Sequence, residues 1–151
     1  MSLPLGPDAR PLRLLAEDAE DLEVISAALQ DAVAKVGDIT FEPAARRLTI
    51  ALNRYRWEAA GGRAGGERVR AGLQLGGVIS VKARRLKREP KDAVVELLAV
   101  EFKRGEAPGG QVILSFAGGA DMSVEVECLD AVLADLSAPW TTRRTPRHEA
   151  G

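Results

Sequence analysis

The stretch QDAVAKVGDITFEPAARRLTIALNRYRWE, residues Gln30–Glu58, decides the fold. It leaves a predicted helix and passes turn residues at Gly37-Asp38 and Pro43, which interrupt regular structure. From Arg47 onward, apolar residues occupy every second position, the pattern of a strand with one buried face. The stretch therefore predicts an architecture built on a long amphipathic strand, and it contains no recognisable catalytic pattern.

The far end of this strand departs from the alternation. Beyond Asn53 the large apolar residues change parity and become Tyr55 and Trp57. Two explanations fit the pattern. Either a β-bulge near Asn53 shifts the strand, or the two ends of the strand are covered on different faces.

A second segment, residues 69–84, has the cleanest period of two in the chain, with Gly76-Gly77 in its middle. We interpret it as one long strand, or as two strands in continuation with a bend at the glycine pair. Glycines inside strands are typical of places where a sheet bends. The segment therefore favours a curved sheet over a flat one.

Two segments have helical spacing. A helix over about residues 18–30 is predicted to begin at Asp18, whose side chain suits the N-cap, and to bury Leu22, Ile25 and Leu29. A second, short helix near the C-terminus is predicted from apolar residues at i, i+3, i+4 and i+7, ending before a proline. Its apolar residues are Leu129, Val132, Leu133 and Leu136.

These elements predict one α+β domain over residues 12–140 with flexible termini at 1–11 and 141–151. We expect a curved, mainly antiparallel sheet of about six or seven strands, closed by one N-terminal and one C-terminal helix. A partly open barrel of pleckstrin-homology-like shape satisfies this pattern. A flat sheet with both helices on one face is the alternative.

The residue inventory restricts the chemistry. Cys128 is the only cysteine and His148 the only histidine among 151 residues, so the usual zinc ligand set is missing. Cys128 ends an alternating strand, and we interpret it as a buried packing thiol. We predict no catalytic residue, no metal site and no cofactor, and we lean against an enzyme because a positioned histidine base is absent from the core.

The sequence also predicts the compartment. The N-terminus lacks a basic head followed by an apolar run, and no segment approaches the ~20 apolar residues of a spanning helix. A single cysteine forms no intrachain disulfide, which suits a reducing environment. We therefore expect a soluble, cytoplasmic protein without a membrane partner.

Charge is strongly segregated along the chain. Residues 46–91 carry most of the bases, whereas the segments on both sides are acidic. One hypothesis is a basic surface that binds an anion or a partner, with Lys87 and Arg88 continuing its run and Tyr55 or Trp57 as a stacking or interface residue. The alternative is that these bases pair with the acidic helix and with Glu125 and Glu127. The candidate binding residues are Arg54, Arg56, Arg68, Arg70, Lys82, Arg84 and Arg85.

Three functional hypotheses follow. The first is a non-enzymatic interaction module with an acidic protein partner. The second is a nucleic-acid or anionic-ligand binder that uses the arginine-rich strands, with affinity that falls as salt rises. The third is a small-molecule or enzymatic pocket inside the curved sheet, which a deep pocket with convergent polar groups would support.

Three ordered segments carry a family resemblance. They are KVGDITFEPAARRLTIALNRYRWE (35–58), RVRAGLQLGGVISVKARRL (68–86) and MSVEVECLDAVLADLSAPW (122–140). In this combination the chain resembles the alphaproteobacterial family catalogued as domain of unknown function 2948, over roughly residues 12–148. The resemblance implies a cytoplasmic, single-domain bacterial protein. It implies no activity and no catalytic residue.

Overall fold

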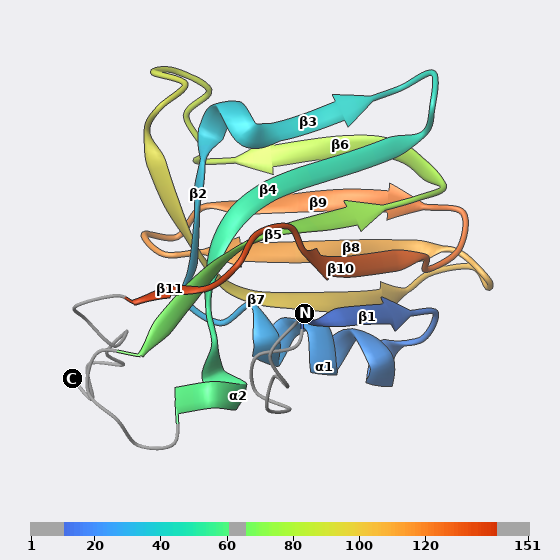
Figure 1. Cartoon of the computed structure of the whole chain (residues 1–151). Helices are drawn as coiled ribbons and strands as arrows, with labels where there is room; N and C mark the ends of the chain where they lie inside the picture. The colour runs from blue at the N-terminus through green and yellow to red at the C-terminus, as the bar shows by residue number, and fades with distance from the viewer. Residues whose placement is uncertain (1–10, 61–65, 142–151) are drawn as a thin grey trace.

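The computed structural model describes residues 11–60 and 66–141. One antiparallel sheet of eleven strands dominates the described chain (Figure 1). The longest helix is α1 (Ala19–Ala28), and two shorter turns of helix lie at Val36–Asp38 and α2 (Trp57–Ala60). The strands are β1 (Arg13–Ala16), β2 (Ala32–Lys35), β3 (Ile39–Glu42), β4 (Arg47–Tyr55), β5 (Glu67–Leu75), β6 (Val78–Arg84), β7 (Val94–Arg104), β8 (Gly110–Phe116), β9 (Asp121–Val126), β10 (Ala131–Asp135) and β11 (Trp140–Thr141).

The strand order is β1-β10-β5-β4-β2-β7-β8-β9-β6, with β3 added to β4 and β11 added to β5. The sheet folds over itself, so that β3, β4, β5, β10 and β1 face β6, β9, β8 and β7 (Figure 1). The short strand β2 joins the two layers, since it pairs with β4 on one side and with β7 on the other. A single apolar core fills the space between the layers.

The predicted α+β class with six or seven strands and two helices is wrong. The molecule is mainly β, with eleven strands and one helix of more than a single turn among the described residues. The antiparallel pairing is confirmed. Thr141, expected in a flexible tail, belongs to β11, whereas the expectations for residues 1–10 and 142–151 lie outside the described residues.

The predicted C-terminal helix is the strand β10. Its residues pair with β1 on one side and with β5 on the other, for example Leu133 with Leu14 and with Leu73. The same letters also fit a period of two, because Leu129, Ala131 and Leu133 are buried. A short apolar run does not distinguish a helix from a buried strand by period alone. The segment is a strand because its backbone forms hydrogen bonds with two neighbouring strands.

The long strand β4 contains no bulge where it faces β5. Its register with β5 is unbroken from Leu48 opposite Leu75 to Tyr55 opposite Arg68. Arg54 continues the buried row of the inner face, and Tyr55 is also fully buried on the other face. The change of parity therefore comes from covering both faces at the end of the strand, the second of the two explanations.

The glycine pair separates two strands that lie in different layers. β5 pairs with β4 and β10, whereas β6 pairs with β9 at the opposite end of the strand order. Gly77 has φ +63°, a left-handed conformation that glycine adopts without strain. The bend predicted at this pair is therefore a passage from one layer to the other.

The helix α1 fills the gap between β1 and β7, which we call the closed seam (Figure 1). The Asp21 N–H donates to the side chain of Asp18 at 2.8 Å, which confirms the predicted N-cap. Leu22 and Ile25 are buried, and Ser26 Oγ accepts the Val100 N–H of β7 at 2.9 Å. Among the described residues, none of the helices is long and apolar enough to cross a membrane.

A second gap lies between β3 and β6, and we call it the open seam. Within the described sheet, β3 pairs only with β4 and β6 pairs only with β9. One backbone hydrogen bond, from the Val78 N–H to the Arg46 carbonyl at 2.9 Å, joins the two sides where β6 begins. Toward the end of β6 the side chains of both strands line a cavity instead of forming a further ladder.

Candidate functional site

The cavity in the open seam has a volume of about 480 Å³. It lies where β3, β4, β6 and β9 converge, and the segment that follows β6 forms part of its wall. This segment is RLKREPK, residues 85–91, and we call it the mouth segment. The lining residues are Val36, Gly37, Ile39, Phe41, Leu48, Val81, Ala83, Leu86, Arg88, Glu89, Lys91 and Met122.

The inner wall of the cavity is apolar. Leu48 and Met122 form its buried floor, and Phe41, Val81 and Leu86 are partly buried against the core. Ala83 also lines the cavity but is exposed. Apolar side chains that face inward and are still reached by solvent mark a place where the core is not fully covered.

The mouth of the cavity is held by backbone contacts. The Gly37 N–H donates to the Lys91 carbonyl at 2.7 Å, and the Val36 N–H donates to the Ala93 carbonyl at 2.9 Å. A Cβ atom at position 37 would meet Lys91 Cβ at 2.9 Å and the Lys91 carbonyl oxygen at 3.0 Å. Glycine at 37 therefore allows the mouth segment to approach the turn before β3.

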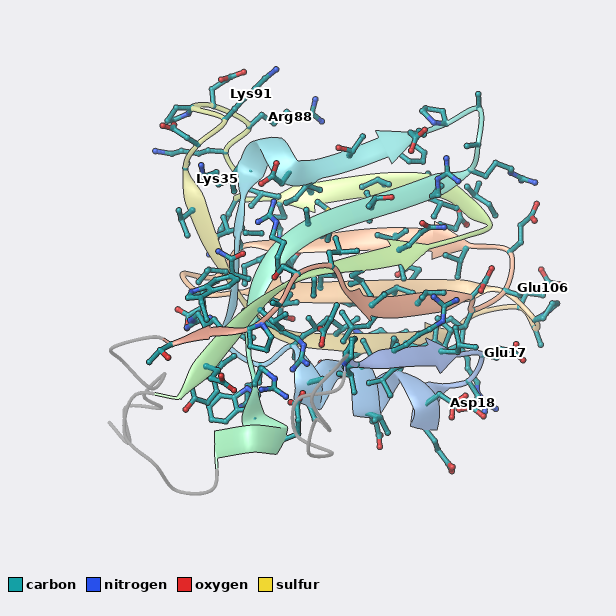
Figure 2. All side chains as sticks on the ribbon, viewed as in Figure 1. Glu17, Asp18, Lys35, Arg88, Lys91 and Glu106 are labelled. Carbon is teal, nitrogen blue, oxygen red and sulfur yellow. The ribbon has the colours of Figure 1, made fainter. Side chains whose placement is uncertain are left out.

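Cations surround this mouth. Figure 2 shows Lys35, Arg88 and Lys91 at one corner of the molecule, and Glu17, Asp18 and Glu106 at the opposite corner. The mouth segment itself carries four bases and one acid. Within residues 11–60 and 66–141, no ion pair involves Lys35 or any of the four bases of the mouth segment. These charges are therefore available to an anion.

Arg54, a predicted binding residue, is instead fully buried between two carboxylates. Its Nε donates to Asp135 Oδ1 at 2.8 Å, and its Nη2 donates to Asp135 Oδ2 at 2.9 Å and to Glu58 Oε2 at 2.7 Å. Its Nη1 donates to Glu58 Oε1 at 2.9 Å and to the Tyr55 carbonyl at 3.3 Å. All five guanidinium N–H groups are used. Arg54 therefore presents no donor to a ligand.

Burial and pairing act in opposite directions on this group. Burial lowers the pKa of Arg54, but its hydrogen bonds to Glu58 and Asp135 outweigh burial and raise the pKa above the ordinary value. Burial raises the pKa of Glu58, yet the Arg54 hydrogen bonds hold it below the ordinary value. Arg54 and Glu58 are therefore both charged at neutral pH, and the hydrogen bonds of Arg54 tie β4 to β10 and α2.

Two further predicted arginines, one directly after β4 and one on β5, are also engaged. Arg56 is buried and forms an ion pair with Glu67. Arg70 reaches Asp38 at 3.1 Å and Asn53 at 3.3 Å. These arginines are neutralised, as the alternative interpretation predicted, but their partners are Glu67 and Asp38 and not the acidic helix, Glu125 or Glu127.

Arg68 lies on the outer face beside Tyr55. Its Nη1 donates to the Asn53 carbonyl at 3.2 Å, and its guanidinium carbon lies 6.0 Å from the centre of the Tyr55 ring. Burial lowers its pKa, and the charges of Asp31 and Glu96 only partly oppose that effect. Because Arg68 lies on the outer face of the β4–β5 pair and the Arg54 side chain points to the inner face, the two arginines do not share a surface.

The three predicted residues after the glycine pair lie in the other layer. Lys82 and Arg84 face outward from β6, opposite Ser123 and Asp121 of β9. Arg84 forms an ion pair with Asp121, whereas Lys82 forms none among the described residues. Arg85 begins the mouth segment and is exposed. The seven predicted residues therefore do not form one surface. They lie in the buried region around Glu58 (Arg54, Arg56), on the outer side of β5 (Arg68, Arg70), and on or after β6 in the other layer (Lys82, Arg84, Arg85).

The predicted stacking residues pack on each other. The rings of Tyr55 and Trp57 lie 4.6 Å apart at 63°, and the Trp57 indole N–H donates to the Gln30 carbonyl at 3.0 Å. Tyr55 is fully buried. Its ring therefore offers no free face to a nucleic-acid base.

The remaining predictions about reactive groups concern Cys128 and metals. Cys128 is exposed, so its interpretation as a buried packing thiol is wrong. The strand β9 ends at Val126, before the residue that the alternation placed on the buried face. The part of the chain that the structure describes holds no group of three potential metal-ligating side chains. His148 lies outside that part.

Sequence reasoning named Arg88 as the continuation of the basic run but did not connect it with Lys35 and Lys91. The connection depends on β2 ending beside the start of β7, where Lys35 is opposite Val94. The one available signal was the density of bases in residues 85–91 beside a proline, since such a run is a poor strand. The cavity itself required the strand order, which single-strand patterns do not contain.

The chain belongs to the family described as "Protein of unknown function (DUF2948)", whose model matches residues 12–148. This match confirms the family resemblance noted from the sequence. No curated protein matches the chain. No solved structure matches it either.

Proposed function

We propose that this protein binds a small amphipathic anion, with the apolar part in the open seam and the charged group at the mouth. One observation carries the proposal. The cavity has an apolar floor, and the cations at its mouth have no ion-pair partner within residues 11–60 and 66–141. This combination suits a carboxylate or phosphate attached to an aliphatic or aromatic body.

The size and chemistry of the cavity support a small molecule. Ligand pockets in proteins commonly have volumes of about 300–1,000 Å³ and are lined mainly by apolar groups with a few placed polar ones. The cavity of about 480 Å³ lies within this range. Its polar lining groups, Arg88, Glu89 and Lys91, are all near the mouth, so they favour a ligand that is charged at one end only.

The mouth favours an anion for electrostatic reasons. Arg88 and Lys91 line the cavity, and Glu89 is the only carboxylate among the lining residues. Charge-assisted hydrogen bonds from such groups to a carboxylate or phosphate are roughly twice as strong as neutral ones. A ligand with a terminal anion therefore gains more from this mouth than its uncharged analogue does.

The alternatives from the sequence receive less support. The nucleic-acid hypothesis relied on Arg54, Arg56 and Tyr55, all of which are buried. An interaction module with an acidic protein partner would use the same exposed cations, but it gives no role to the apolar cavity beside them. Binding without catalysis and a cytoplasmic location remain parts of our proposal, and the single cysteine supports the location.

The test is a fluorescence titration with a medium-chain fatty acid that carries a dansyl group, and with its methyl ester as the uncharged analogue. We expect saturable binding of the acid and weaker binding of the ester. Replacing Arg88 by Gln is expected to weaken binding of the acid by about fivefold, the equivalent of ~1 kcal/mol, and to leave the ester unaffected.

Two variants that add the same bulk separate pocket binding from adhesion to the surface. Ala83→Phe places a ring in the cavity, whereas Ser123→Phe places one on the outer face of the same layer, opposite Lys82. We expect Ala83→Phe to abolish binding and Ser123→Phe to bind like the parent. Absence of saturable binding by the parent, or equal binding by both variants, would contradict the proposal.

A further inference from the structure

The cations at the mouth of the cavity lie opposite an acidic corner of the molecule (Figure 2). Lys35, Arg88 and Lys91 lie at one corner, and Glu17 and Asp18 lie at the opposite one (Figure 2). The net charge of the whole chain is only −1. Attraction to an anionic surface therefore depends on orientation, and the orientation it favours turns the mouth toward that surface.

Apolar side chains lie among these cations. Val94 is 62% exposed and is paired in register with Lys35. Pro90 is exposed within the mouth segment, and Leu86 is partly buried at the cavity wall. Cations interleaved with exposed apolar residues are typical of surfaces that bind the interface of an anionic bilayer.

From this arrangement we propose that the mouth segment and Lys35 dock on an anionic lipid bilayer, so that the cavity exchanges its ligand with the membrane. The proposal rests on the proposed function for what enters the cavity, and on the cations and exposed apolar residues of the mouth for docking. An amphipathic anion partitions into bilayers, which makes a membrane the natural source of such a ligand. The sequence alone predicts no membrane partner, and the grouping of Lys35 with the mouth segment is the observation that favours one.

A bilayer fits these observations better than nucleic acid does. Binding to single strands combines cations with aromatic rings on which bases stack. Tyr55 is buried, and Trp57 packs against it by α2, away from the mouth. The exposed apolar residues among the cations are Val94 and Pro90, which are not aromatic, and the one aromatic residue that lines the cavity, Phe41, is partly buried against the core.

The test is flotation of the full chain with vesicles of phosphatidylcholine, alone or with about one third phosphatidylglycerol. We expect binding to the anionic vesicles only, and weaker binding as salt rises. Lys35→Gln combined with Lys87→Gln is expected to weaken binding about 25-fold, from about fivefold for each charge near the surface. Neither side chain lines the cavity, so this double variant is expected to weaken binding of the dansyl fatty acid by less than the roughly fivefold loss expected for Arg88→Gln.

The matched control removes the same charge elsewhere. Lys103→Gln combined with Arg104→Gln acts at the far end of β7, next to the turn that contains Glu106, and is expected to leave vesicle binding unchanged. Equal losses in the two double variants would overturn docking through the mouth. So would binding of the parent to a mixed-sequence oligonucleotide without binding to vesicles.

The two proposals fail in different ways. Ala83→Phe is expected to lose the fatty acid and to keep vesicle binding, because it fills the cavity and leaves the cations in place. Fatty-acid binding by a parent that does not bind anionic vesicles would overturn docking and leave the proposed function intact. Vesicle binding by a parent that does not bind the fatty acid would support docking and contradict the proposed function.

Discussion

The closed seam and the open seam are both gaps between strands of the folded sheet, but only the closed seam is filled by a helix. At both places the edges of a folded sheet approach each other without pairing. Between β1 and β7 the gap is filled by α1, which buries Leu22 and Ile25. Between β3 and β6 the gap is lined by Phe41, Val81 and Leu86, which remain partly accessible.

The charges follow the same division. Near β1, Asp135 accepts the Leu12 N–H at 2.7 Å and pairs with the buried Arg54. At the open seam, Arg88 and Lys91 form no ion pair within the described residues. Cations used for the fold are therefore satisfied inside the protein, and cations available for binding are at the mouth.

The largest difference is expected between two arginines. Arg54→Met would leave Asp135 buried without its partner, and loss of one member of a buried ion pair costs about 3–5 kcal/mol. Arg88→Met acts on an exposed side chain and is expected to change the free energy of unfolding by less than about 0.5 kcal/mol. Urea unfolding of both variants measures the contrast, and similar losses would remove the distinction.

The second difference concerns two leucines with the same truncation. Leu22→Ala at the closed seam removes a fully buried side chain and is expected to cost about 2–5 kcal/mol. Leu86→Ala at the open seam is expected to cost about 1 kcal/mol, because its side chain is only partly buried. The same unfolding experiment decides, and an equal cost would mean that the open seam is ordinary core.

The third prediction sharpens the description of the mouth. Gly37→Ala adds a Cβ that is too close to the Lys91 backbone, so the mouth segment must move. We expect a loss of ~1–3 kcal/mol in unfolding free energy, the usual range for overpacking, together with weaker binding of the dansyl fatty acid. Gly118→Ala is no suitable control because of its positive φ, whereas Gly72→Ala on β5 adds the same Cβ against the end of the Leu136 side chain, which does not line the cavity. Unchanged binding by Gly37→Ala would show that the position of the mouth segment does not affect binding in the cavity.

The smallest expected effect is a pH dependence of the unfolding free energy that comes from Glu58 in the Arg54 cluster. The pKa of Glu58 is lower in the folded protein than its ordinary value of 4.5, so its contribution is complete above pH 4.5. That contribution is lost as the pH falls through the folded value. Stability measured across this acid range is expected to fall less in Glu58→Gln than in the parent, and identical profiles would show that the Arg54 cluster does not couple to folding through Glu58.

The local patterns of the sequence predicted individual elements correctly but not the fold class. The N-cap at Asp18, the helix that buries Leu22 and Ile25, and the strand that begins at Arg47 are all present. These features depend on residues near each other in sequence, where periodicity and capping act. The prediction of a helix at β10 was wrong for the opposite reason, because pairing with the distant strands β1 and β5 determined its conformation.

The candidate site was harder to predict than the fold. Composition and spacing do not reveal which arginine has a carboxylate partner, and Arg54 looked like Arg88 in the sequence. One partner of Arg54, Glu58, is four residues away, but the other, Asp135, is 81 residues away. The site also needed the positions of Lys35 and Lys91 beside each other, which the pairing of β2 with β7 provides.

The central claim is that the open seam is a binding site and the closed seam is core. The most direct measurement follows the methyl resonances of both seams by NMR while the dansyl fatty acid is added. We predict saturable shifts for Ile39, Val81 and Leu86, and none for Leu22 and Ile25. Shifts confined to the residues of the closed seam, or no shifts at either seam, would contradict the account.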